Sequence, residues 1–471
     1  MKKIKENKRF LIILLLCISI CLFSVCFYLL ESDYLWHIKA GEYMFKNGIL
    51  KKDVFSWYVK SKYWMSHEWL FELFIYSLKV LFGKMHTFIY CFITILSMGL
   101  LLYLSNIKNY LKNSIFTIIW ICCFILVFPF VQVRPHLISY NLLIITVWFL
   151  YDLYKNEDSK KIYFLPLITI LWSNFHGGSS NLVYLLCLLF IIGGLFKFKF
   201  SKIEANKLSK KQLIKYSVIM FICIICVCIN IHGIKMLFYP YENMLDSTMI
   251  NNITEWKGTT LNSGSGYIYY GFLLFIVGIL LFSKKKIQLM DLLLFLFVAY
   301  LGIKSIRFWF YTYIVMSYVV FNYIDSREDD KGTGLCIMTI SILLCLIFVF
   351  KVYDVYNVSD NYLVNDKTIN IIKKENPKRL FNMYNYGGDL VYNDIPVFID
   401  GRADLYSKYN YKDYIDISLL RRDTPKLINK YKFDYFLVDK NYPIYVYINS
   451  NKNYSMIYQN NKYAFYKKIN N

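Results

Sequence analysis

Acidic and imidazole side chains gather directly after the first long apolar run of the chain. Glu31, Asp33 and His37 lie close together, and Trp36 precedes the histidine. If this stretch is helical, Asp33 and His37 share one face of the helix. Such a group could bind a divalent metal, Mg²⁺ or Mn²⁺, or remove a proton from a hydroxyl nucleophile. Glu31 and Asp33 could equally be helix-start residues that the helix dipole stabilises.

A second acid and histidine pair, His67 and Glu68, precedes the next apolar segment. A titratable pair at a membrane surface is well placed for general acid–base catalysis. Ser66 could instead make this stretch a helix-capping device. Between the two groups lies Asp53-Val54-Phe55-Ser56.

Further polar side chains border later apolar segments. Arg134 and Arg307 could bind an anion, or could simply extend to the membrane surface. The pattern Asn-x-His-Gly occurs twice, at Asn174 to Gly177 and at Asn230 to Gly233. A helix C-cap explains each glycine, but not the shared asparagine and histidine. We expect a polar cleft to be lined by Trp36, His136, Asn174, His176, His232 and Glu255.

The C-terminal part carries the sequence Asp400-Gly401-Arg402-Ala403-Asp404. It could form a salt-bridged turn. As a functional alternative, Arg402 would bind an anionic group.

The elements that must position these residues are apolar. The 471 residues are 57% hydrophobic and 18% charged, with a mean hydropathy of +0.38, which excludes an ordinary soluble enzyme. Long apolar runs without charge predict a polytopic α-helical membrane protein with about 11 spanning helices. The runs are 10–30, 114–133, 136–151, 178–196, 216–234 and 267–283.

Lysine and arginine alternate between the loops. They are dense in residues 1–9, 105–113, 152–161, 197–215, 284–286 and 325–331. The positive-inside rule places these loops and the N-terminus in the cytoplasm. The other loops, which include 31–67 and 233–266, are then external. This alternation needs an odd number of crossings between residues 67 and 105, so we expect 68–82 to lie partly in the interface and 85–104 to span.

The net charge of +22 follows from these loops, so we expect membrane lipids and no nucleic acid as partners. The 12 cysteines lie in or beside apolar runs, which indicates packing rather than metal binding or disulfides.

We divide the chain into a membrane domain, residues 1–351, and a soluble extracytoplasmic α/β domain, residues 352–471. In the second domain, lysine, asparagine, aspartate and tyrosine are dense and no run could span a bilayer. A helix is expected over 424–431, with Thr424 as its cap. Short strands are expected over 396–399, 435–438, 444–448 and 463–466.

The motifs together resemble the GT-C superfamily of membrane glycosyltransferases, in its bacterial branch similar to protein mannosyltransferases. They are Asp33-x-x-Trp36-His37-x-x-x-Gly41, Asp53-x-Phe55-Ser56, His67-Glu68-Trp69-Leu70 and Asp400-Gly401-Arg402. The resemblance implies transfer of a sugar from a polyprenyl-phosphate donor to a cell-envelope glycan, lipid or protein on the outer face, with inversion. It also implies that Asp33 is the base or a metal ligand, and that Arg134, Arg307 or Arg402 binds the donor phosphate.

One departure from the superfamily concerns the second acid that it often carries at a later helix. Arg134-Pro135-His136 occupies the corresponding place, so a metal requirement stays open. Two other classes also stay open: a flippase or transporter of lipid-linked intermediates, and a non-catalytic scaffold of envelope assembly.

Overall fold

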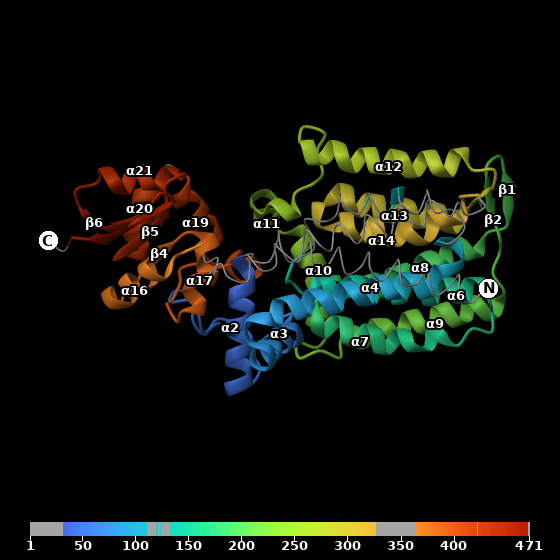
Figure 1. Cartoon of the computed structure of the whole chain (residues 1–471), viewed down its shortest axis with the longest axis horizontal. Coiled ribbons are helices and arrows are strands. Elements are labelled where there is room, and N and C mark those ends of the chain that lie inside the picture. The colour runs from blue at the N-terminus through green and yellow to red at the C-terminus, as the bar shows by residue number, and fades with distance from the viewer. Residues whose placement is uncertain are drawn as a thin grey trace. The chain divides into compact units, whose positions relative to one another are not determined.

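The computed structural model describes residues 32–110, 119–120, 123, 132–325, 363–421 and 423–469. They divide into two compact units (Figure 1). The helical unit contains Lys84–Leu245 and the described residues from Ile250 to 325. The mixed unit contains 32–83, Asp246–Met249 and the described residues from 363 onward. The predicted fold, largely helical with a small C-terminal α/β region, is confirmed at this level. Residues 32–83, which the sequence analysis assigned to the membrane domain, belong to the same compact unit as the C-terminal residues.

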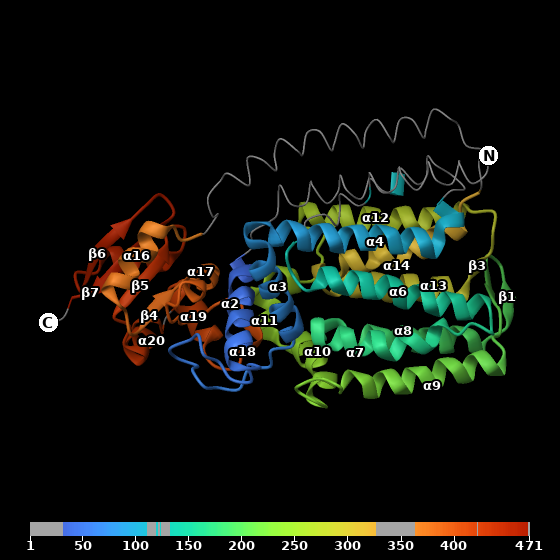
Figure 2. The same ribbon diagram turned by 60° about the horizontal axis from the view of Figure 1, so that its bottom comes forward.

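The helical unit is a bundle whose long helices run side by side in both views (Figures 1 and 2). Neighbours pack directly, as α4 does on α6, α8 on α9 and α13 on α14. The helices are α4 His86–Tyr110, α6 His136–Lys155, α7 Leu165–Phe175, α8 Leu182–Leu195, α9 Lys210–Val227, α10 Lys235–Leu245, α12 Gly264–Phe282, α13 Leu289–Lys304 and α14 Trp309–Val319. In a short helix, α11 Ser247–Asn252, the residues up to Met249 belong to the mixed unit and those from Ile250 onward to the helical unit.

Three helical stretches among the described residues are long and apolar enough to cross a membrane: Trp69–Leu102, His136–Lys155 and Gly177–Leu195. Gly266–Phe282 is apolar but shorter. The first stretch is interrupted at Gly83, whose φ is +52°, so that α3 (Trp69–Phe82) ends before α4 begins. The expected count of about 11 spans stays a prediction. Two predicted spans lie wholly or mostly outside the described residues, 10–30 and 114–133.

The loops of the helical unit meet in two groups. Two lysine-rich loops join in a small sheet, in which β2 (Ile203–Ala205) pairs with both β1 (Phe198–Phe200) and β3 (Ile287–Gln288). In the same group, Lys211 Nζ lies 2.5 Å from Asp158 Oδ1. In the other group, the backbone amide of Ile306 donates to the carbonyl of Lys257 at 3.2 Å. These are the two groups that the alternation of basic residues defines, whereas the side of the membrane on which each lies stays a prediction.

Two helices of the mixed unit, α2 (Ser32–Asn47) and α3, pack against each other. Gly41 permits the close approach, because a Cβ atom there would lie only 2.1 Å from the carbonyl oxygen of Glu72. His37 lies near Glu72, and Phe45 contacts Tyr76 about two turns further along α2 and one turn further along α3. The two helices therefore run in the same direction.

The rest of the mixed unit surrounds a four-stranded sheet in the order β4-β5-β7-β6. β4 is parallel to β5, and the other pairs are antiparallel. The strands are β4 Leu380–Asn382, β5 Tyr435–Asp439, β6 Tyr454–Gln459 and β7 Tyr463–Lys468. The helices are α16 Asp366–Glu375, α17 Gly387–Tyr392, α18 Ala403–Tyr406, α19 Tyr411–Ser418, α20 Thr424–Tyr431 and α21 Pro443–Ser450.

The secondary structure of this unit was predicted in part. The expected helix over 424–431 and the strands near 435–438 and 463–466 are confirmed, although Asp423 rather than Thr424 precedes the helix. The strand expected over 444–448 is wrong, because these residues form α21. The strand expected over 396–399 is also wrong: Val397 alone makes an isolated bridge, to Ser56.

Candidate active site

Asp33 lies in the first turn of α2, where its carboxylate meets the backbone of Gly401. An ideal Cβ atom at Gly401 would lie 1.8 Å from Asp33 Oδ1 and 2.7 Å from Trp36 Nε1. Asp33 and Trp36 are one turn apart on the helix, so both reach the same point. The structure therefore brings Asp33, the predicted base, to the predicted Asp400-Gly401-Arg402 turn.

His37 lies next to the Trp36 ring, with ring centres 3.7 Å apart, and between two glutamates of the α3 region. Its Nε2 atom lies 3.7 Å from Glu68 Oε2, and its Nδ1 atom lies 3.6 Å from Glu72 Oε1. Ser66 donates a hydrogen bond of 3.0 Å to the other oxygen of Glu72. Ser66 is therefore not the cap of α3, since Glu68 occupies the N-cap position. Glu72 was not predicted, although its spacing of four residues from Glu68 on one helix could have indicated it.

His67 extends the cluster toward the C-terminal turn. Its Nε2 atom lies 3.2 Å from Glu68 Oε1, and its Nδ1 atom lies 4.0 Å from Asp404 Oδ2. Burial opposes the charged imidazolium, but the charge and hydrogen bond of Glu68, with the charge of Asp404, outweigh it and raise the pKa of His67. The structure thus assembles His37, His67 and Glu68 and adds Glu72 and Asp404 to them.

The raised pKa of His67 predicts a pH-dependent stability. A group whose pKa is higher in the folded state stabilises that state fully below its unfolded pKa, about 6.5 for histidine. The contribution is lost as the pH rises through the raised pKa. We expect Glu68→Gln to reduce this dependence of stability on pH, because glutamine has no negative charge to favour the imidazolium of His67. Thermal unfolding in detergent from pH 5 to 9 measures it, and identical pH profiles for the variant and the wild type would contradict the assignment.

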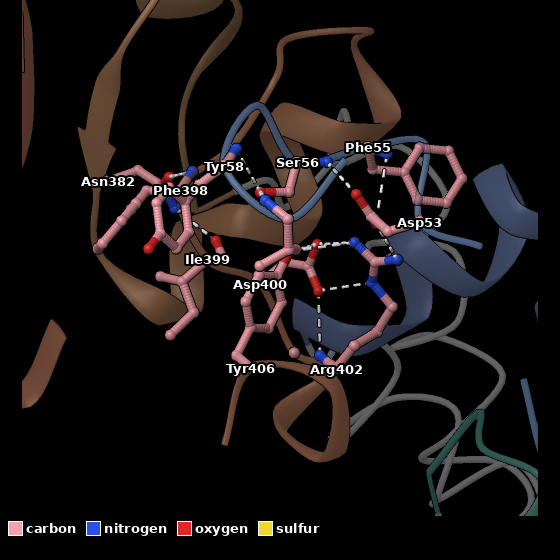
Figure 3. A network of polar contacts seen from close by, with 12 residues as sticks. Asp53, Phe55, Ser56, Tyr58, Asn382, Phe398, Ile399, Asp400, Arg402 and Tyr406 are labelled. Atoms are coloured by element: carbon pink, nitrogen blue, oxygen red, sulfur yellow. Dashed lines mark hydrogen bonds and ion pairs between the residues drawn. The ribbon is translucent and has the colours of Figure 1, made fainter. Parts of the chain in front are cut away.

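Arg402 lies in a buried network that joins the first loop to the C-terminal turn (Figure 3). Its Nε and Nη2 atoms donate to the two carboxylate oxygens of Asp400 at 2.8 and 2.6 Å. Its Nη1 atom lies 2.6 Å from Asp53 Oδ1. Tyr406 also donates to Asp400, at 2.8 Å.

This network corrects the functional alternative for Arg402. The residue is only 2% exposed and its guanidinium is engaged by two carboxylates, so it is not open to a lipid-linked phosphate. The salt-bridged turn, the other alternative from the sequence, is the one that forms. Its partner Asp53 belongs to the Asp53-x-Phe55-Ser56 motif, and the sequence alone does not predict this pairing. The carboxylate of Asp53 also accepts a hydrogen bond from the backbone of Ser56 at 2.9 Å.

The other predicted phosphate ligands lie in the helical unit. Arg134 Nη1 donates to both carboxylate oxygens of Glu255, at 2.8 and 2.9 Å. The guanidinium of Arg307 lies 4.5 Å from the centre of the Trp256 ring. Burial would raise the pKa of Glu255, but the positive charges of Arg134 and Arg307 outweigh it and lower the pKa. Glu255 thus joins the two arginines in one polar group. His136 adds a smaller lowering effect on Glu255.

The two Asn-x-His-Gly motifs come together. Asn230 Nδ2 donates to Asn174 Oδ1 at 3.1 Å and to the carbonyl of Ser173 at 2.7 Å. The shared asparagines therefore join the end of α7 to the segment after α9. His176 Nδ1 lies 2.7 Å from Ser139 Oγ, and both it and His232 are buried. These contacts are structural links, and a role of these residues in a cleft stays a prediction.

The tentative metal site from Glu31 and Asp33 depends on a residue outside the described part of the chain, Glu31. Among the described residues, no group of three or more His, Cys, Asp or Glu side chains is placed to hold a metal ion.

Comparisons with known proteins give similarities of structure only. No family model matches the chain, and no curated protein matches it. Solved structures of an oligosaccharyltransferase from Archaeoglobus fulgidus are similar over much of the chain. The form tethered to an acceptor peptide with the NVT sequon has 12% identity and a TM-score of 0.49, covering 90% of this chain and 68% of that one. The complex of AglB with an inhibitory peptide and a dolichol-phosphate has 11% identity and a TM-score of 0.49, covering 92% and 70%. The complex with Zn and sulfate has 10% identity and a TM-score of 0.44, covering 90% and 68%. Scores of this size at such low identity leave the activity of this chain to be argued from its own residues.

Proposed function

We propose that this protein is a glycosyltransferase of the cell membrane that moves a sugar from a polyprenyl-phosphate donor to a cell-envelope glycan, lipid or protein. The N-terminus is cytoplasmic, and the mixed unit, including its C-terminal part, is on the outer face. The observation that carries the proposal is the position of Asp33, whose carboxylate is held against Gly401 next to a cluster of two histidines and three acids. The likeness of the motifs to those of the GT-C superfamily supports it.

The chemistry assigned to Asp33 is general base catalysis. Its carboxylate takes the proton of the acceptor hydroxyl while the hydroxyl oxygen attacks the anomeric carbon of the donor. The bond between that carbon and the phosphate oxygen breaks, its electrons stay on the phosphate, and polyprenyl phosphate leaves. The configuration at the anomeric carbon is inverted, because attack and departure occur on opposite sides.

Of the two predicted phosphate ligands in the helical unit, Arg307 is the better candidate. Its guanidinium stacks on Trp256, whereas Arg134 already binds both oxygens of Glu255. A guanidinium matches the geometry of phosphate oxygens, and stacking on an aromatic ring holds its plane without using its donors.

The test is a turnover assay with the purified full-length protein in lipid. A panel of polyprenyl-phosphate sugars is supplied with a cell-envelope extract as acceptor, with and without Mg²⁺ or Mn²⁺, and released polyprenyl phosphate is measured. Release that needs the acceptor supports the proposal. A folded protein that releases none from any donor would contradict it and favour a flippase or a scaffold.

A further inference from the structure

The contact between Gly401 and Asp33 depends on the lack of a side chain at Gly401. A Cβ atom there would lie 1.8 Å from Asp33 Oδ1 and 2.7 Å from Asp33 Cγ. Real Cβ atoms essentially never approach a non-bonded heavy atom within 3.0 Å. The backbone of the C-terminal turn therefore forms a wall directly against the carboxylate, and any larger residue would push the carboxylate away.

Gly401 is itself held from both sides. Its carbonyl oxygen accepts a hydrogen bond of 2.9 Å from the hydroxyl of Tyr384. The next residue, Arg402, is fixed by Asp400 through two hydrogen bonds, and the backbone amide of Arg402 donates to Asp400 at 3.0 Å. Such a turn has little freedom, because both neighbours of the glycine belong to one buried ion pair.

The same network anchors the turn to the segment that follows α2. Arg402 binds Asp53 in that segment, and two backbone hydrogen bonds of 3.1 Å join it to Val397, from Val397 to Phe55 and from Trp57 to Val397. The guanidinium also lies 4.7 Å from the centre of the Trp64 ring. Figure 3 shows the side chains of Asp53, Asp400 and Tyr406 converging on Arg402. The turn that contacts Asp33 is thus fixed by bonds to the segment that follows α2.

We propose that the turn Asp400-Gly401-Arg402 positions the carboxylate of Asp33 for proton removal, and that Arg402 serves the reaction through this turn rather than by binding phosphate. The inference rests on the proposed function of Asp33 as the base. A general base must be held to within a fraction of an ångström of its working position, and a displacement of about 1 Å can cost about 100-fold in rate. The turn supplies that restraint, which makes the C-terminal residues part of the active site.

The first experiment tests the contact without using activity. Asp33→Cys and Gly401→Cys are combined in the full chain in lipid, and peptide mass spectrometry follows mild oxidation. Cysteine at position 33 removes the carboxylate that a Cβ atom at position 401 would meet. That Cβ position lies 2.7 Å from Asp33 Cγ, the place that the cysteine sulfur takes, so the two side chains are within reach of a disulfide. We expect a peptide that links positions 33 and 401, absent from each single variant. Failure of the folded double variant to form this link would overturn the inference.

The second experiment tests the role in turnover. Gly401→Ala is expected to lower kcat about 100-fold while the KM for the donor changes little. The acidic limb of the pH profile of kcat is expected to move, because the carboxylate leaves its backbone contact. Gly271→Ala in α12 is the matched control, since a Cβ atom there meets nothing within 4 Å. Arg402→Lys, which keeps the charge but not the bidentate geometry, is expected to lower kcat about 10-fold. Its loss of stability should be smaller than that of Arg402→Met, which removes the charge.

The outcomes separate this inference from the proposed function. Wild-type turnover together with normal kcat and an unchanged pH profile in folded Gly401→Ala would overturn the inference and leave the function standing. A wild-type protein that releases no polyprenyl phosphate would overturn the function and, with it, the role of the turn, even if the disulfide forms. A fall in kcat for both Gly401→Ala and Arg402→Lys, with no change in Gly271→Ala, supports the inference.

Discussion

Asp33→Asn is expected to lower the release of polyprenyl phosphate by about 10²- to 10⁴-fold, which is the contribution typical of a positioned general base. The amide has nearly the same shape as the carboxylate, so it fits against Gly401 in the same way. It cannot remove a proton from an acceptor hydroxyl, because the amide carries no negative charge and its nitrogen lone pair is delocalised into the carbonyl, which makes it a very weak base. Binding of the donor should therefore be retained while turnover is lost, which kcat and KM measured with and without divalent metal will show.

Glu42→Gln is the control for this substitution. Glu42 lies on the same helix and binds Lys39 and Lys46, away from the Gly401 contact. It should keep full turnover, which excludes a general effect of removing a negative charge from α2. Turnover by Asp33→Asn equal to that of Glu42→Gln would contradict the role of Asp33 and leave the transferase proposal without its base.

Much of the fold could be predicted, because hydrophobic pattern and loop charge are local properties of the chain. The apolar runs that begin near His136, 178 and 267 became α6, α8 and α12. The alternation of basic residues divides the loops into two sets, and loops of the same set contact each other in the structure. This is expected, because only loops at the same end of a helical bundle can meet. The helix over Thr424–Tyr431 was found from its proline, which is favoured in a first helical turn.

The errors in the mixed unit have a common cause. Ile444 to Ile448 alternates tyrosine with β-branched residues, which is typical of a strand. The structure instead buries Ile444 and Ile448, four residues apart, while Val446 is 64% exposed, which is the spacing of a helix face. Val397 makes a strand-like bridge to the first loop only, and nothing near it in the sequence indicates a partner so distant. In both segments, tertiary contacts rather than the local sequence determine the secondary structure.

The sequence predicted which residues belong to the candidate site, but not which of them contact each other. The sequence singled out Asp33, His37, His67, Glu68 and Arg402 by type and position. It could not show that Arg402 would bind Asp53 or that Gly401 would touch Asp33, because such pairing depends on how distant segments fold together. It also missed Glu72 and Asp404, whose carboxylates lie near His37 and His67.

Arg402→Met is expected to destabilise the mixed unit by about 3–5 kcal/mol, the cost of leaving a buried charge without its partner. Methionine roughly fills the space of the side chain but cannot neutralise Asp53 and Asp400, which are both buried. Thermal unfolding in detergent at pH 7 measures the effect as a lower Tm. Adding Asp53→Asn to Arg402→Met should recover part of the loss, because one of the two uncompensated carboxylates is then neutral.

Arg421→Met provides the matched comparison. Arg421 also binds a carboxylate, Asp416 at 2.8 Å, but its side chain is 55% exposed. An exposed pair contributes about 1 kcal/mol or less, because water screens both charges. A Tm for Arg402→Met as high as that for Arg421→Met would mean that the Arg402 network does not stabilise the fold. The turn at Gly401 would then lack the rigidity that holding the carboxylate of Asp33 requires.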